Sequence, residues 1–396
     1  MKAFTKNIFA AAALAWTLAV SGCSVADDGP HRQQPSGPED NRLELRQNPD
    51  WSITYTGREE YVDGNGDRSE VDGIRVTSMD NEHYYLDIIT KVQFDNSYGN
   101  DLKSYLEDEL DIVSGNVKDY GSSFDAETSV GDQTFLFDRM RSGKWRAIAL
   151  GITSRGKLTG DYAVLDFTVS EETPSEDYLK WTGNWKLTGK SKSDGKTDVA
   201  YSVNISQADA NYIYTIRGWE TGENMRNNMS DYSIETVYDK FRGTMVFKGQ
   251  YLETYTENNA TYDFCFFGNF LYDGSAGYRD MTPGEYTITD YIPIAEAFTV
   301  SAHSASLQAC GLDFDHDGSV YRTQFTSMQY FDLQYGDDGI FTYNDDIPEF
   351  PMDMTRDEPG TSVSMASAAP AAKALKITPA RVSGDRHRAS RFRKVR

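Results

Sequence analysis

Hydrophobic and polar residues alternate with a period of two along most of this chain. The alternation runs through residues 51–55, 84–88, 163–169, 199–205 and 262–266, and turn-forming residues separate the runs. Successive side chains of a β-strand point to opposite faces, so this period is typical of strands that bury one face. We therefore predict a mainly β protein.

One segment, 101–113, has helical spacing instead. Its apolar residues recur every three or four positions, at Leu102, Tyr105, Leu106, Leu110 and Val113. Asp101 precedes them and is a good N-cap residue, because its carboxylate can accept hydrogen bonds from the first free N–H groups of a helix. The pattern predicts one amphipathic helix inserted among the strands of the first half.

An acidic segment that contains a proline, EETPSED at 171–177, divides the β-rich body. This composition is typical of a linker between domains. We expect one domain at 49–172 and a second at 178–357, which is consistent with the usual size of about 100–200 residues per domain.

The N-terminal segment 1–22 has the layout of a secretory signal. Two lysines precede an apolar stretch of about a dozen residues, which is too short to cross a bilayer as a helix. The stretch ends in V-S-G-C, which resembles the bacterial lipobox. This resemblance implies that the signal is removed after residue 22 and that Cys23 carries a diacylglycerol. Residues 23–48, rich in Pro, Gly and charge, would then form a flexible tether.

The residues after Cys23, SVADD, resemble the surface-export signal of Bacteroidetes lipoproteins, in which acidic residues follow the lipidated cysteine. A solvated acidic linker is the alternative interpretation. The chain as a whole resembles a Bacteroidetes cell-surface or outer-membrane lipoprotein of uncharacterised function. The resemblance implies an extracytoplasmic protein whose membrane partner is the outer membrane, contacted through its lipid.

Two parts of the body resemble known β folds. Residues 144–163, in which an aromatic strand leads to glycine turns, resemble the late strands of fibronectin-type-III-like sandwiches. Residues 178–185, with the motif W-T-G-N-W, resemble the entry of lipocalin-like barrels. These resemblances imply an Ig/fibronectin-III-like β-sandwich with one inserted helix in the first domain. They imply an antiparallel lipocalin-like β-barrel or sandwich in the second. Two apolar runs around the turn residues Asp-Asp-Gly predict a closing hairpin at 328–341.

The C-terminal segment 358–396 is rich in Ala, Ser and Pro and ends in basic residues. From Lys373 onward it has nine Lys or Arg and one Asp, a net charge of +8, which leaves −30 for the rest of a chain whose total is −22. Few apolar residues and like charges predict a disordered basic tail. The tail could instead dock on the acidic body, on anionic lipid or on polysaccharide. The acidic body excludes nucleic acid as a partner, because phosphate backbones select basic surfaces.

Asp313, Asp315 and Asp317, in the sequence DFDHDG, match the start of a calcium-binding loop. Carboxylates are hard oxygen ligands, and the glycine after them permits a tight bend. Position twelve of such a loop is Gln324 rather than Glu, which excludes an EF-hand. Calcium is therefore a candidate cofactor at a turn of another kind, and a plain acidic hairpin turn is the alternative.

Apart from Cys23 the chain has two cysteines, Cys265 and Cys310. Both lie in apolar stretches, so both are expected in the core. In an oxidising compartment they could form a disulfide, and two buried free thiols are the alternative.

Tryptophan rings could stack on a sugar ligand, and Trp185 and Trp219 are the candidates for this role. Most aromatic residues in alternating strands belong to the core instead. In lipocalin-like barrels a tryptophan near the first strand closes the barrel floor, so the resemblance implies that Trp181 or Trp185 is a core residue.

The sequence contains none of the common catalytic motifs of hydrolases or of nucleotide-binding proteins, so an enzyme is not favoured. Three functions remain open. The first is a non-enzymatic binding or accessory module for glycan or another extracellular ligand. The second is a structural or adhesive surface protein of the fimbrial type, which a strand-donating terminus would mark. The third is a hydrolase with an unrecognised pair of carboxylates.

Overall fold

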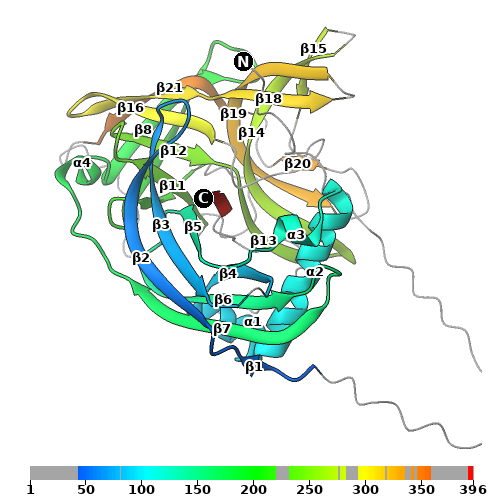
Figure 1. Ribbon diagram of the computed structural model, residues 1–396. Helices are drawn as coiled ribbons and strands as arrows, with labels where there is room; N and C mark the ends of the chain where they lie inside the picture. The colour runs from blue at the N-terminus through cyan, green and yellow to red at the C-terminus, as the bar shows by residue number, and fades with distance from the viewer. Residues whose placement is uncertain are drawn as a thin grey trace, which may run out of the picture.

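The computed structural model describes residues 43–80, 82–219, 232–274, 277–281, 293–316, 319–334, 340–342, 346–357 and 391–395. Within these ranges the protein is mainly β, as the alternating pattern predicts (Figure 1). None of the helices in these ranges is long and apolar enough to cross a membrane.

The first unit of the structure contains two four-stranded sheets. One sheet has the order β1-β7-β6-β4, with bounds Arg46–Gln47, Leu158–Val169, Gly143–Ile152 and Tyr84–Thr90. The other has the order β2-β3-β5-β22, with bounds Trp51–Val62, Arg68–Ser78, Gln133–Asp138 and Arg391–Val395. Neighbouring strands are antiparallel, except that β1 pairs parallel with β7. The C-terminal residues 391–395 thus contribute a strand to a sheet formed by the first third of the chain.

Strands β4 and β6 bury both of their faces. Their alternate residues Leu86 and Ala149 belong to the core between the two sheets, together with Ile74 and Phe135 of the second sheet. The residues between them, such as Ile148, pack into a separate apolar cluster on the other face. Two buried faces explain why the sequences of β4 and β6 are nearly continuous apolar runs.

Three helices, and not one, lie between β4 and β5: α1 (Lys91–Tyr98), α2 (Leu102–Tyr120) and α3 (Phe124–Glu127). The prediction of a single helix at 101–113 is therefore wrong in number and in length. The sequence of helix α1 has no apolar stripe, and Phe94 is its one buried residue, so hydrophobic periodicity does not predict this helix. Asp101 caps α2 as expected, and its carboxylate accepts hydrogen bonds from the N–H groups of residues 103 and 104. The helix continues past Val113 and ends at Gly121, which adopts the left-handed conformation.

The second unit contains a closed barrel of eight antiparallel strands, preceded by the short helix α4 (Glu176–Leu179). The strands follow each other around the barrel as β8, β9, β10, β11, β12, β16, β17 and β21. Their bounds are Gly183–Ser191, Asp198–Asp209, Ile213–Arg217, Ser233–Asp239, Thr244–Lys248, Pro293–Ser301, Ser304–Ala309 and Pro348–Arg356. Of the two predicted alternatives, barrel or sandwich, the barrel is confirmed.

Two excursions from the barrel form a further sheet. β13 (Gln250–Glu257), β14 (Ala260–Gly274) and β15 (Gly277–Met281) lie between β12 and β16. β18 (Gly311–His316), β19 (Ser319–Gln334) and β20 (Ile340–Thr342) lie between β17 and β21. The sheet has the order β13-β14-β19-β18, with β15 beside β14 and β20 beside β19. The hairpin predicted at 328–341 exists as β19–β20, but β21 closes the barrel by pairing with β8, so its predicted closing role is wrong.

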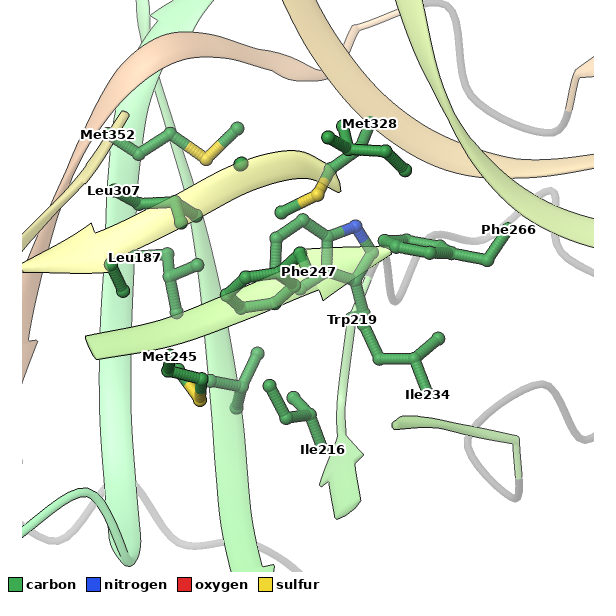
Figure 2. Close-up of a cluster of buried hydrophobic side chains, with 14 of the residues drawn as sticks. Leu187, Ile216, Trp219, Ile234, Met245, Phe247, Phe266, Leu307, Met328 and Met352 are labelled. Carbon is green, nitrogen blue, oxygen red and sulfur yellow. The ribbon is translucent and has the colours of Figure 1, made fainter. Parts of the chain in front are cut away.

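Side chains fill the barrel interior, because alternate residues of every barrel strand point inward. Figure 2 shows Trp219 at the centre of this core, between Phe247 of β12 and Phe266 of β14. The ring centroids of Trp219 lie 5.7 Å from Phe247 and 5.5 Å from Phe266. The excursion sheet therefore shares one core with the barrel.

The apolar clusters of the two units have no described residue in common, and polar contacts join the units instead. Arg139, which follows β5, pairs with Glu70 of β3 and lies 3.1 Å from Glu172. Its guanidinium also stacks at 4.8 Å on the ring of Tyr212. Further contacts across the junction are Arg141 with Glu235, Ser142 with Asp209, Lys240 with Glu70, and Asn211 with Glu172.

Candidate functional site

The hairpin β13–β14 continues the barrel core outward as a ladder of aromatic rings. Phe266 is fully buried against Trp219, and Phe264 stacks on Tyr330 of β19 with a centroid distance of 5.3 Å. Farther along the hairpin, Tyr255 and Tyr262 are opposite each other and stack at 5.2 Å with an interplanar angle of 18°. These two tyrosines are partly exposed, so the ladder ends at the surface.

Carboxylates hold the hydroxyl groups of this aromatic surface. The Tyr255 hydroxyl donates to Oδ2 of Asp332 at 2.6 Å, and Asp332 is buried in β19. The Tyr232 hydroxyl donates to Glu253, and the ring of Tyr232 packs edge-on against Phe264 at 4.7 Å. We call Tyr232, Glu253, Tyr255, Tyr262 and Asp332 the tyrosine face.

Local sequence explains why the hairpin forms. Asn258 and Asn259 are its two turn residues, and both have positive φ, at 50° and 67°. Two such residues make a type I′ turn, whose twist matches that of the flanking strands, and Asn tolerates this conformation better than most residues. Because Glu257 then pairs with Ala260, the register places Tyr255 opposite Tyr262.

The opposite side of the same hairpin is also polar. The Thr254 hydroxyl donates to Asp263 at 2.6 Å, and Thr254 in turn contacts the Tyr251 hydroxyl. Burial raises the pKa of Tyr251, although its hydrogen bond to Thr254 lowers it in part. The phenol therefore stays protonated at neutral pH and remains a hydrogen-bond donor.

The tyrosine face combines flat rings with fixed acceptors. Partly exposed parallel rings can stack on the apolar face of a sugar, and carboxylates accept hydrogen bonds from sugar hydroxyls. Among the described residues, no three His, Cys, Asp or Glu side chains are grouped so that they could hold a metal ion. The chemistry that this arrangement offers is recognition of a neutral, hydroxyl-rich ligand.

The tryptophans that the sequence offered for ligand stacking lie elsewhere. Trp185 and Trp219 are each 2% exposed and belong to the barrel core, so neither presents a ring to solvent. Trp185 points inward from β8, and Trp219 packs against aromatic rings from three strands, β9, β12 and β14. Trp181 is also 2% exposed, and its carbonyl accepts a hydrogen bond from Trp185 Nε1 at 2.8 Å.

The backbone places Asp313 and Asp315 in strand β18, where they pair with residues 322 and 320 of β19. Asp317 lies outside the described residues. His316 pairs with Ser319, so the sequence expected to form a calcium turn forms the arm of a hairpin up to residue 316. Calcium binding at this hairpin stays a prediction.

Cys265 and Cys310 are free thiols, the former buried and the latter half-buried. Cys265 of β14 pairs with Phe331 of β19, whereas the carbonyl of Cys310 accepts a hydrogen bond from the N–H of Phe325, six residues earlier on β19. Six residues of a strand span roughly 20 Å, and a disulfide needs Cα atoms within about 7 Å. The two cysteines are therefore too far apart to pair, and burial raises the pKa of the Cys310 thiol to about 11.

The sequence interpretation missed the tyrosine face, because it assigned aromatic residues in alternating strands to the core. A signal was present in YLETYTENNATYDF, where two alternating runs flank an Asn-Asn turn and acidic residues lie between the aromatics. Cys23 and the tether to residue 42 lie outside the described residues. Comparison of the chain with models of protein families, with curated proteins and with solved structures found no match.

Proposed function

We propose that this protein is a lipid-anchored, non-enzymatic module on the outer membrane that binds a glycan through the tyrosine face. The observation that carries the proposal is the stacked pair Tyr255–Tyr262 at the surface, with the Tyr255 hydroxyl on Asp332. Both rings are held by strands of a sheet that shares its core with the barrel, so they are ordered before a ligand arrives. Ordered aromatic rings bind with little loss of side-chain entropy.

The ligand class is a neutral or cationic saccharide. The chain without its basic tail carries a net charge of −30, and an acidic sugar would be repelled by it. The partly exposed Glu253 of the tyrosine face supplies an acceptor for hydroxyl groups and would repel an anionic ligand, whereas the buried Asp332 holds the Tyr255 hydroxyl.

The direct test is binding of the full chain and of Tyr262→Ala to an array of immobilised glycans. Loss of one stacking ring is worth about 1 kcal/mol, so Tyr262→Ala should bind its glycan about fivefold more weakly. Tyr262→Phe keeps the ring and should retain most of the binding.

The matched control is Tyr61→Ala, since Tyr61 is a partly exposed tyrosine on β2 of the first unit. It should bind glycan as the unmodified chain does. Equal binding by Tyr262→Ala and the unmodified chain, with both folded, would remove the tyrosine face as the site.

The anchor has its own test, because it rests on the lipobox resemblance and not on the tyrosine face. The mature chain should begin at Cys23 and carry a diacylglycerol, measured by mass spectrometry of the membrane fraction. Cys23→Ala should be released or left unprocessed. An unlipidated mature N-terminus at another residue would contradict the anchor.

The finer fold assignments belong to this proposal. The eight-stranded antiparallel barrel, with Trp185 buried in its first strand, supports the lipocalin-like interpretation of the second unit. The filled interior makes this barrel a scaffold rather than a container. The two facing sheets of the first unit support the fibronectin-III-like interpretation, from which the helical layer and the parallel strand β1 depart.

A structural or adhesive surface protein is the second candidate. The observation in its favour is that residues 391–395 form a strand of the first unit, although the sequence offered no alternating apolar terminus. Under this alternative the terminus joins copies of the protein, and glycan binding is absent.

A further inference from the structure

The outer strand of one sheet in the first unit comes from the far end of the chain. β22 pairs antiparallel with β5, with Arg391 opposite Phe137 and Val395 opposite Thr134. Figure 1 shows the C-terminus, in red, next to β5. On its other side β5 pairs with β3, so β22 supplies the second row of hydrogen-bond partners for β5.

Without β22, strand β5 would be an edge strand with unpaired backbone N–H and C=O groups on one side. Edge strands usually carry proline, lysine or a bulge that prevents pairing with another chain. The sequence of β5, QTFLFD, has neither Pro nor Lys, and its residues 135–137 are buried. Strand β5 therefore requires a covering strand.

Strand β22 has the basic composition of an edge strand that resists pairing with another chain. Its sequence RFRKV contains three basic residues, Arg391, Arg393 and Lys394. Once β22 is in place, the outermost strand of the sheet is a basic one, and basic strands resist further pairing. Strand β5 thus offers a free edge for pairing, and β22 covers that edge.

The pairing with β5 can be made by the C-terminal strand of the same chain or of a neighbouring copy. The connecting residues 358–390 lie outside the described residues, and a segment of this length can span roughly 100 Å when extended. A strand from a neighbouring copy would form the same hydrogen bonds with β5. When an identical element is exchanged, its contacts are conserved, and local concentration decides which strand is bound.

We infer that the edge of β5 is an acceptor site for the C-terminal strand of a second copy of this chain. Reciprocal exchange of β22 produces a closed dimer, and exchange in one direction links copies in a row. The charges are compatible with exchange, because the tail carries +8 and the rest of every copy carries −30. The inference does not rest on glycan binding.

The test uses the register of the two strands. Thr134 and Val395 are opposite each other, and opposite residues of an antiparallel pair have Cα atoms about 4.5–5.5 Å apart, within the range of a disulfide. One full chain carries Thr134→Cys and another carries Val395→Cys, both with Cys310→Ser and both extracted in detergent. The two are mixed under oxidising conditions at increasing concentration, up to the order of 1 mM that a tethered strand reaches.

We expect a disulfide-linked dimer of the two chains whose fraction rises with concentration. An excess of a peptide of residues 387–396 should lower that fraction, and a scrambled peptide should not. Ser69→Cys, on the exposed part of β3, mixed with Val395→Cys should give no link. Each cysteine variant alone reports any link that does not need the second introduced cysteine, including one through Cys265.

The double variant Thr134→Cys/Val395→Cys measures the same pairing within one chain. A link within the double variant, together with no link in the mixture at the highest concentration, would show that the strand is never exchanged and would overturn the inference. No link in either preparation would overturn it as well, because the pairing itself would be absent.

Discussion

Arg139 of the first unit donates a hydrogen bond from Nη2 to the carbonyl oxygen of Ala210 in the second unit, at 3.1 Å. Arg139 is 8% exposed, and it also pairs with Glu70 and Glu172. One side chain thus bonds a backbone carbonyl of the second unit and two carboxylates of the first unit. The units are held together by charge and hydrogen bonds rather than by a shared apolar core.

Replacement of Arg139 should therefore destabilise the junction strongly. Arg139→Ala removes a buried guanidinium that bonds Glu70, Glu172 and the Ala210 carbonyl. Lys240 still pairs with Glu70 and Arg58 with Glu172, so the expected cost is that of lost hydrogen bonds to charged groups, about 1.5–3 kcal/mol. Chemical denaturation followed by tryptophan fluorescence measures the change. Arg75→Ala is the control, because Arg75 and its partner Asp132 are both about half exposed and such a pair is worth about 1 kcal/mol or less. Equal losses in the two variants would show that Arg139 does not hold the units together.

The junction should also weaken in acid. Burial would raise the pKa of Glu172, but the hydrogen bond from Asn211 and the charges of Arg139 and Arg58 outweigh it and lower this pKa below its ordinary value of 4.5. A lowered folded-state pKa stabilises the fold fully above the unfolded value, and this stabilisation is lost as the pH falls through the folded value. The free energy of unfolding should decline below about pH 4.5, measured by denaturation from pH 7 to pH 3. In Glu172→Gln the decline should be smaller, and an unchanged slope would exclude this carboxylate as the cause.

Trp181 should behave as a core residue. It is 2% exposed beside Trp185, with ring centroids 6.0 Å apart, and removal of a buried tryptophan costs about 3–5 kcal/mol. Trp181→Ala should lower the melting temperature markedly or unfold the barrel. Leu179→Ala, two residues away and 38% exposed, should change stability little. A fully stable Trp181→Ala protein would contradict the assignment.

Calcium binding at the β18–β19 hairpin is tested by thermal unfolding. If Asp313, Asp315 and Asp317 bind calcium in the folded state, millimolar calcium should raise the melting temperature, with up to about 2.7 kcal/mol gained at a hundredfold excess over Kd. Asp315→Ala should remove the shift, and the same concentration of magnesium should produce a smaller one. No shift in the unmodified chain would leave the segment as a plain acidic hairpin.

The sequence alone predicted several of the strands and the start of helix α2. The alternating residues 199–205 and 262–266 lie in strands β9 and β14, as predicted, and Asp101 caps α2, as expected from its side chain. These features depend on residues close in the chain, because strand alternation and helix capping are local properties of the backbone. For the same reason α1 was missed: it has one buried residue and offers no periodic signal.

The tertiary structure decided everything that depends on distant partners. Periodicity shows that Trp185 and Tyr262 both lie in strands, but β8 directs Trp185 into the closed barrel whereas the β13–β14 hairpin carries Tyr262 to the surface. No local pattern indicates that residues 391–395 pair with β5 or that Arg139 bridges two units. These contacts join residues far apart in sequence, and only the long-range pairing of strands determines which residues become neighbours.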